Sequence, residues 1–192
     1  GIGQGPGEVI KVPTFTGMSP KKDTLYIHDF NARDMKIYYL NAKDSTVSFK
    51  FAYSKKLANP LVDNLGTGYF TICRLKNGHY VGLSGLCHSD IFHVLDSDLN
   101  IVKRFGGFPL DGLTTDGSTT NMTLSFMGNL VNHGNSIYYA ANKFGYIARY
   151  DITDDLEIKL VWENFYSKTD YRIDNRQVKF GSDNLHGFSG IA

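Results

Sequence analysis

A unit of three short strand-like runs recurs three times in this chain of 192 residues, and this repeat strongly limits the folds open to it. Each run is rich in aromatic and β-branched residues and ends at Gly, Asn, Asp or Ser, as strands and turns do. The first unit comprises residues 25–30, 35–40 and 47–53, the second 80–84, 91–96 and 101–105, and the third 137–141, 146–151 and 158–162. With Leu25, Tyr80 and Ile137 as equivalent positions, the repeat spans 55 and then 57 residues.

A further strand candidate precedes each unit, at Val9 to Phe15, Tyr69 to Leu75 and Leu124 to Val131. Four antiparallel strands per repeat are typical of the blade of a β-propeller. A β-sandwich is the alternative, but it would not require every fourth connection to be long. We therefore predict an all-β fold, a partial β-propeller in a single domain. Its blades are expected at about 8–53, 68–106 and 122–164, with the start of a fourth at 186–192.

The composition agrees with a chain built from strands and argues against two classes of partner. Aromatic residues make up 14% of the chain, it contains 20 Gly, and no stretch keeps the apolar spacing of a helix. The 20 Lys and Arg nearly balance the 19 Asp and Glu, and they form no basic stripe that would favour nucleic acid. No apolar run approaches the ~20 residues that a membrane-spanning helix needs.

The lengths of the connections indicate which end of the blades carries function. In a four-stranded meander, the first-to-second and third-to-fourth turns share one end, and here they are short, as at Asn77-Gly78. The connections at the other end are longer, at about 54–68, 106–121 and 167–185. Scaffolds commonly keep their binding residues on such loops. The ligand-binding candidates on this loop-rich face are His28, Arg33, His88, Asp90, Lys143 and Arg172.

Two motifs resemble metal sites but are better explained by ordinary turn and strand chemistry. Asp96-x-Asp98-x-Asn100 opens like a calcium loop, yet Gly is missing from the sixth position and Glu from the twelfth. We expect its side chains to cap a turn. Cys87, His88 and His93 have no further ligands at zinc spacing, and we expect His93 in a strand between blades. No metal and no other cofactor is predicted.

The two cysteines are predicted to be free thiols. If Asn77-Gly78 is a two-residue turn, Cys73 faces Gly82 in the neighbouring strand. Cys87 then lies about 16 Å from Cys73 at the usual rise of a strand. A disulfide needs its two Cα atoms within ~7 Å, so this register does not allow one.

The segment Gly3-Gln4-Gly5-Pro6-Gly7-Glu8, followed by Leu25-Tyr26-Ile27-His28-Asp29 and Met35-Lys36-Ile37-Tyr38, resembles the TolB-like six-bladed propeller proteins of Bacteroides-type bacteria. The closing residues 186–192 look like the entry to another blade. The resemblance implies a six-bladed propeller exported by a lipoprotein-type leader to the periplasm, outer membrane or cell surface. It carries over no catalytic residue. The chain departs from the family because it has no lipid-attachment Cys near its start and is too short for six blades.

Since no catalytic constellation is evident, we predict a non-enzymatic binding or scaffold propeller of the cell envelope, with a glycan, peptide or protein as ligand. The alternative is a lyase or hydrolase whose site lies at the central channel and uses His28, His88 or Asp90. A purely structural interaction module is a third hypothesis, which a large apolar patch on the loop face would reveal. Three blades should not close a ring. We therefore expect the chain to be about half of a longer propeller, or to pair with a second copy through its end blades.

Overall fold

Every regular element in the described part of this chain is a β-strand, as the repeat predicts. The computed structural model describes residues 5, 8, 13–43, 46–57, 68–84, 90–110, 126–174, 177–182 and 187–188, and none of them lies in a helix. Within these ranges, no segment therefore has the long apolar helix that could cross a membrane. The all-β fold class is confirmed: the strands form four-stranded antiparallel sheets, arranged like the blades of a partial propeller.

Three sheets follow one another along the chain, each with its strands in sequence order. The first contains β1 (Pro13–Met18), β2 (Thr24–Asp29), β3 (Asp34–Lys43) and β4 (Thr46–Lys56). The second contains β5 (Tyr69–Arg74), β6 (Tyr80–Ser84), β7 (Phe92–Leu95) and β8 (Ile101–Phe105). The third contains β9 (Gly128–His133), β10 (Ser136–Ala141), β11 (Tyr146–Ile152) and β12 (Ile158–Phe165).

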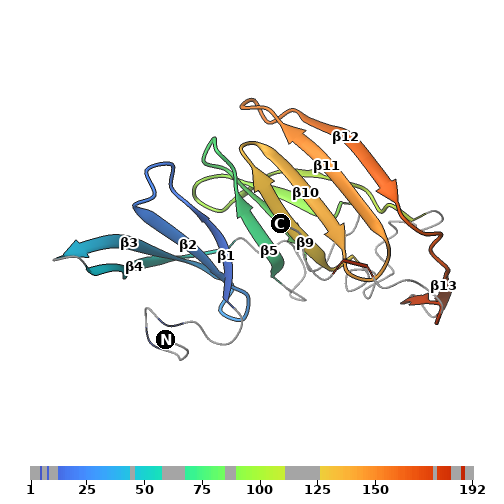
Figure 1. The fold of residues 1–192 in the computed structure, drawn as a ribbon, viewed down its shortest axis with the longest axis horizontal. Helices are drawn as coiled ribbons and strands as arrows, with labels where there is room; N and C mark the ends of the chain where they lie inside the picture. The colour runs from blue at the N-terminus through green and yellow to red at the C-terminus, as the bar shows by residue number, and fades with distance from the viewer. Residues whose placement is uncertain are drawn as a thin grey trace.

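The three sheets stand side by side, so each face of the middle sheet meets a neighbouring sheet (Figure 1). The first strands of the sheets are neighbours in space, with β1 against β5 and β5 against β9. Asn132 of β9 donates from its side-chain nitrogen to the Arg74 carbonyl of β5 at 2.9 Å, which ties the second pair together. We call the contact between the first and second sheets the first joint, and that between the second and third the second joint.

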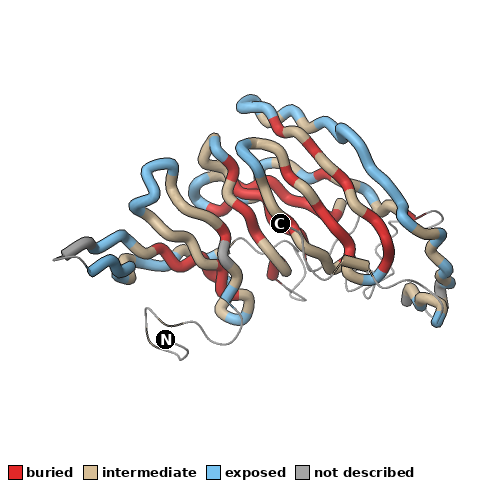
Figure 2. The backbone as a smooth tube through the Cα atoms, in the orientation of Figure 1, coloured by how far each residue is buried: buried red, intermediate tan, exposed pale blue. Residues whose placement is uncertain are grey.

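The hydrophobic core lies in these two joints. The first joint buries a small cluster that includes Met35, Ile37, Tyr80 and Leu95. The second joint buries a much larger one, with Phe92 at its centre. Figure 2 shows the buried residues concentrated in the strands around β5, β9, β10 and β11, whereas exposed residues follow β12 and much of the β3–β4 hairpin.

All three sheets share a β-bulge between their third and fourth strands, and the bulge aligns the repeats residue by residue. It falls after Ile37 in the first sheet, after Val94 in the second and after Arg149 in the third. The residues of the second strands that pair with these three positions are therefore equivalent as well: Tyr26, Val81 and Tyr138. Their neighbours Leu25, Tyr80 and Ile137 are then equivalent too, in agreement with the spacing read from the sequence.

The structure corrects the register expected for the β5–β6 hairpin. The loop has three residues rather than two: Leu75 N donates to the His79 carbonyl at 2.8 Å, and Gly78 has a φ of +92°. A type I turn followed by a left-handed Gly gives this longer loop, whereas the prediction assumed a two-residue turn. Cys73 consequently pairs with Val81 and not with Gly82. Cys73 is a free, buried thiol, as predicted, and burial raises its pKa to about 12; Cys87 lies outside the described residues.

Several strand positions also differ from those expected. The described part of the first strand starts at Pro13 and continues to Met18, beyond the expected end at Phe15, whereas residues 9–12 lie outside the described residues. β9 begins at Gly128, after Phe126 and Met127, which belong to no strand. Within the connection expected at 167–185, the chain forms a further hairpin of β13 (Tyr171–Asp174) and β14 (Gln177–Phe180). Of the residues expected to open a fourth blade, the structure describes only Gly187 and Phe188.

Candidate functional site

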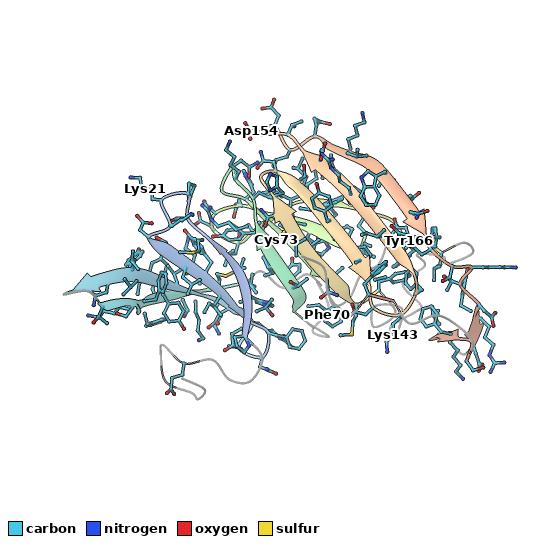
Figure 3. The ribbon with its side chains drawn as sticks, viewed as in Figure 1. Lys21, Phe70, Cys73, Lys143, Asp154 and Tyr166 are labelled. Atoms are coloured by element: carbon cyan, nitrogen blue, oxygen red, sulfur yellow. The ribbon has the colours of Figure 1, made fainter. Side chains whose placement is uncertain are left out.

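The two ends of the sheets differ, and we call them the loop end and the turn end. At the loop end of each sheet, the residue that directly follows the fourth strand is hydrogen-bonded to the connection between the second and third strands. These bonds are Leu57 N to Arg33 O at 3.1 Å, Ile91 N to Gly106 O at 2.8 Å and Tyr166 N to Gly145 O at 2.7 Å. Figure 3 shows Phe70 and Lys143 toward this end and Lys21 and Asp154 at the opposite, turn end.

His28 does not lie on an exposed loop but inside β2, where its side chain is fully buried. It pairs directly with Met35, so it faces the first joint. Neither ring nitrogen has a hydrogen-bond partner among the described residues. Burial lowers the pKa of His28 to about 4, which keeps the ring neutral near pH 7. In this position His28 cannot touch a ligand at the surface.

Arg33 occupies the connection between β2 and β3 and is exposed, as a binding residue at the loop end should be. Its backbone has a φ of +53°, and its side chain runs beside Gly68 at the entry to β5. Phe30 of the same connection stacks on Phe70, with ring centroids 6.1 Å apart. The first two sheets therefore present one cation and two aromatic rings to the loop end.

The second sheet places Asp90 directly before β7, partly buried. Burial of the His93 ring lowers its pKa to about 4, and this effect outweighs the negative charge of Asp90, which raises the pKa. His93 lies in β7 between the first and second sheets, as predicted. His88, the other candidate here, lies outside the described residues.

His93 is paired with Tyr69, a contact that the sequence does not reveal. The Tyr69 hydroxyl and His93 Nδ1 are hydrogen-bonded at 3.0 Å, and the two rings meet edge to face. Gly82 makes room for them, because a Cβ at this position would lie 2.4 Å from the Tyr69 ring. Tyr69 is 0% and His93 3% exposed, and burial raises the pKa of Tyr69. This pair therefore acts as a buried structural contact and is closed to a substrate.

Lys143 and Arg172 are brought to the same region by aromatic packing. Lys143 lies exposed in the connection between β10 and β11, and Arg172 lies exposed in β13. Phe144, next to Lys143, stacks on Phe180 of β14 at 5.8 Å and 20°. The β13–β14 hairpin is thereby anchored at the loop end of the third sheet.

The hairpin forms a cavity of about 360 Å³ around Arg172. Its lining combines two cations, a carboxylate, a hydroxyl and two aromatic residues: Asp170, Tyr171, Arg172, Lys179, Phe180, Gly181 and Ser182. Lys179, directly opposite Arg172, donates to Asp174 at 2.6 Å and holds the pKa of that carboxyl below its usual value. No ion pair of Arg172 is found within the described ranges. Of the two cations in the lining, Arg172 is therefore the one without a direct ion pair, although its charge also helps to lower the pKa of Asp174.

The Asp96 motif caps a turn, as predicted. Asp96 Oδ1 accepts hydrogen bonds from the backbone N–H groups of Asp98 at 2.8 Å and Asn100 at 2.9 Å. These bonds lower the pKa of Asp96, since they stabilise its charged form. Across the part of the chain that the structure describes, no group of three His, Cys, Asp or Glu side chains is placed to hold a metal ion.

Comparisons with known proteins give a similarity of fold. No protein-family model matches the chain, and no curated protein matches its sequence. Among solved structures, the chain is similar to a "putative exported protein" from Bacteroides fragilis, at 18% sequence identity and a TM-score of 0.51. The match covers 83% of this chain and 39% of that protein. The chain therefore spans about two fifths of that protein's length.

Proposed function

We propose that this chain forms part of a non-enzymatic binding propeller of the bacterial cell envelope, of the TolB-like six-bladed kind. The motif at residues 3–8 and the repeat of four-stranded sheets support the family. The similarity to a protein named as exported supports the envelope location. On this proposal the blades keep the boundaries 8–53, 68–106 and 122–164, and residues 186–192 enter a further blade.

The observation that carries the binding role is the cavity of the β13–β14 hairpin. It lies at the loop end, where its lining residue Phe180 stacks on Phe144, and its lining includes Arg172, Asp170, Ser182 and aromatic side chains that suit one small ligand. Ligand sites in proteins commonly combine apolar walls with a few well-placed polar groups. A sugar, whose hydroxyls need donors and acceptors and whose ring stacks on aromatics, fits this lining. A short peptide with an acidic end, which would pair with Arg172, fits it as well.

The lyase or hydrolase alternative gains no support from the described histidines. Both His28 and His93 are buried in the first joint, where neither can take a proton from a bound substrate. Asp90 remains the one described candidate of that hypothesis near the loop end. The binding role therefore fits the described site better than the catalytic role.

A binding screen with variants at the two ends of the sheets tests this proposal. The chain is applied to arrays of oligosaccharides and of short peptides, and the best ligand is then titrated by calorimetry. We expect Arg172→Ala to weaken binding at least about tenfold, the value of one charge-assisted contact. Lys143→Ala should have a smaller effect in the same direction.

Lys21→Ala is the matched control, because Lys21 is equally cationic and exposed but lies at the turn end (Figure 3). Binding should be unchanged in this variant. Equal affinity of wild type and Arg172→Ala would contradict the hairpin site. Circular dichroism of each variant shows whether the fold is retained.

A further inference from the structure

One face of the β13–β14 hairpin carries a row of charges of alternating sign. The pairing of the two strands continues one residue beyond them, because Gly181 N donates to the Asp170 carbonyl at 2.9 Å. Asp170, Arg172 and Asp174 stand at every second position, so they belong to the same face. Lys179 lies on this face as well, directly opposite Arg172. Two anions and two cations are thus gathered on one short hairpin.

Two of these four charges neutralise each other. Lys179 and Asp174 form an ion pair at 2.6 Å, and the hydrogen bond from Lys179 is the main reason that the pKa of Asp174 is lowered. Like charges directly opposite each other on paired strands are unfavourable, so this ion pair also reduces the repulsion between Lys179 and Arg172. Outside the pair, the lining of the cavity holds one cation, Arg172, and one anion, Asp170.

Gly181 makes room for the Asp170 carboxylate at this cavity. A Cβ added at Gly181 would overlap Asp170 Oδ2, so the carboxylate leans across the position where its pairing partner has no side chain. A carboxylate has about four acceptor positions, so Asp170 can accept from a ligand in addition to its contacts within the chain. At the usual rise of a strand, the Cα atoms of Asp170 and Arg172 lie about 7 Å apart. The cavity therefore holds opposite charges within reach of one small molecule.

Aromatic residues supply the apolar part of the lining. Tyr171 and Phe180 are directly opposite each other in the hairpin, and both are partly buried against the apolar cluster of the second joint. The stacking of Phe180 on Phe144 holds this wall in place. The cavity volume of about 360 Å³ is near the lower end of the roughly 300–1,000 Å³ usual for small-molecule sites. The lining thus combines two opposite charges with an apolar wall around a small volume.

We infer that this cavity binds a small zwitterion, an α-amino acid with an apolar side chain; the inference rests on the binding function proposed above and narrows its ligand. The α-carboxylate pairs with Arg172, whose planar fork of N–H groups matches a carboxylate. The α-ammonium group donates to Asp170, and the side chain lies against Tyr171 and Phe180.

Charge complementarity favours this ligand over the sugars and peptides that share parts of its chemistry. A neutral sugar brings no countercharge to either Arg172 or Asp170, and an anionic sugar brings its charge close to Asp170 as well. In an extended peptide, each residue moves the ammonium group about 3.5 Å farther from the terminal carboxylate. In an α-amino acid a single carbon atom separates the two charged groups, so both meet residues that stand two positions apart.

Calorimetric titration of the chain with phenylalanine and two derivatives tests this inference. Phenylalanine amide has no carboxylate and N-acetyl-phenylalanine has no ammonium group, so each should bind about tenfold more weakly than phenylalanine. Arg172→Gln should weaken the binding of phenylalanine about tenfold but leave that of the amide unchanged. Asp170→Asn should likewise weaken phenylalanine but not the N-acetyl derivative. An unfolded variant would instead lose every ligand.

Arg104→Gln in β8 and Asp155→Asn in the β11–β12 turn are the matched controls, because they make the same changes at exposed residues outside the hairpin and should leave all affinities unchanged. Equal affinity for phenylalanine and both derivatives, or no binding of phenylalanine, would overturn the inference. If an oligosaccharide or peptide binds at Arg172 while phenylalanine does not, the proposed binding function stands without it. If no ligand of any class binds, both fail.

Discussion

The two joints bring equivalent strands of adjacent sheets together, β1 with β5 and β5 with β9, but they differ in chemistry. In the second joint, Phe92 of β7 contacts Phe105, Tyr139 and Tyr150 with centroid distances of 5.1–5.6 Å, inside a continuous apolar cluster. The first joint has a small cluster and adds the buried rings of His28 and His93. All buried polar or charged side chains of the described residues belong to the first two sheets: Thr16, His28, Asp29, Asp34, Lys36, Ser84 and His93.

The same four-stranded repeat therefore forms two chemically different contacts between sheets. The second joint depends on apolar burial, which changes little with pH. The first joint depends partly on neutral histidines, whereas surface lysine contacts occur at both joints, Lys55 with Asp98 at 2.9 Å and Lys103 with Glu157 at 3.8 Å. It should therefore be the weaker joint, and the one that conditions can loosen.

The largest effect should follow from truncation at the centre of the second joint. Phe92→Ala removes a fully buried ring and three aromatic contacts, so we expect a loss of about 3–5 kcal/mol in the free energy of unfolding. Urea denaturation followed by fluorescence measures it. Val102→Ala, at a half-exposed residue of the adjacent β8, should cost less than about 0.5 kcal/mol. A loss below about 1 kcal/mol for Phe92→Ala would mean that this ring is not central.

The next effect is a pH dependence that belongs to the first joint. The pKa of His28 is about 4 in the folded chain, below its ordinary value of 6.5, so the unfolded chain takes up the proton more readily. The contribution of His28 is therefore complete above pH 6.5 and is lost as the pH falls toward 4. At pH 5 the loss should be about 2 kcal/mol relative to pH 7.

The variant His28→Leu isolates this contribution. Its free energy of unfolding should fall less than that of wild type between pH 7 and pH 5. His133→Gln, at an exposed residue of β9, serves as the control and should retain the wild-type slope. Identical slopes for wild type and His28→Leu would show that His28 does not link this joint to pH.

A smaller effect is expected where Gly82 accommodates the Tyr69–His93 pair. Gly82→Ala should cost about 1–3 kcal/mol, because the new Cβ meets the Tyr69 ring and forces it away from His93. Gly107→Ala is the control, since no atom lies within 4 Å of a Cβ added there. Thermal denaturation of both variants tests this packing. Equal melting temperatures for the two would contradict the close fit at Gly82.

The repeat could be predicted because each strand carries its own signal. Leu25, Tyr80 and Ile137 align in the structure as they do in the sequence, since each unit contains the same strands and the same bulge. The predicted pairing of Cys73 with Gly82 was wrong, because Asn-Gly fits both a two-residue turn and the longer turn with a left-handed Gly78.

The candidate site was less predictable, because it depends on which residues tertiary packing covers. In the sequence, His28 stands beside Asp29 near the end of a strand, a position typical of an exposed polar residue. Its burial results from the packing of the second sheet against β2. Arg172 could be chosen as a cation in a long connection, but its cavity arises from a hairpin of four-residue strands. The alternation of Tyr171 with Ile173, and of Val178 with Phe180, is the signal that could have identified this hairpin.

Hydrogen exchange of the backbone amides at pH 7 and pH 5 tests the contrast between the joints most directly. After correction for the intrinsic exchange rates, we expect protection of β2 and β3 to fall at least about tenfold at pH 5. Protection of β10 and β11 should remain nearly constant, because the second joint contains no buried histidine among the described residues. Equal losses in both sheets, or no loss in the first, would contradict a pH-sensitive first joint beside an apolar second one.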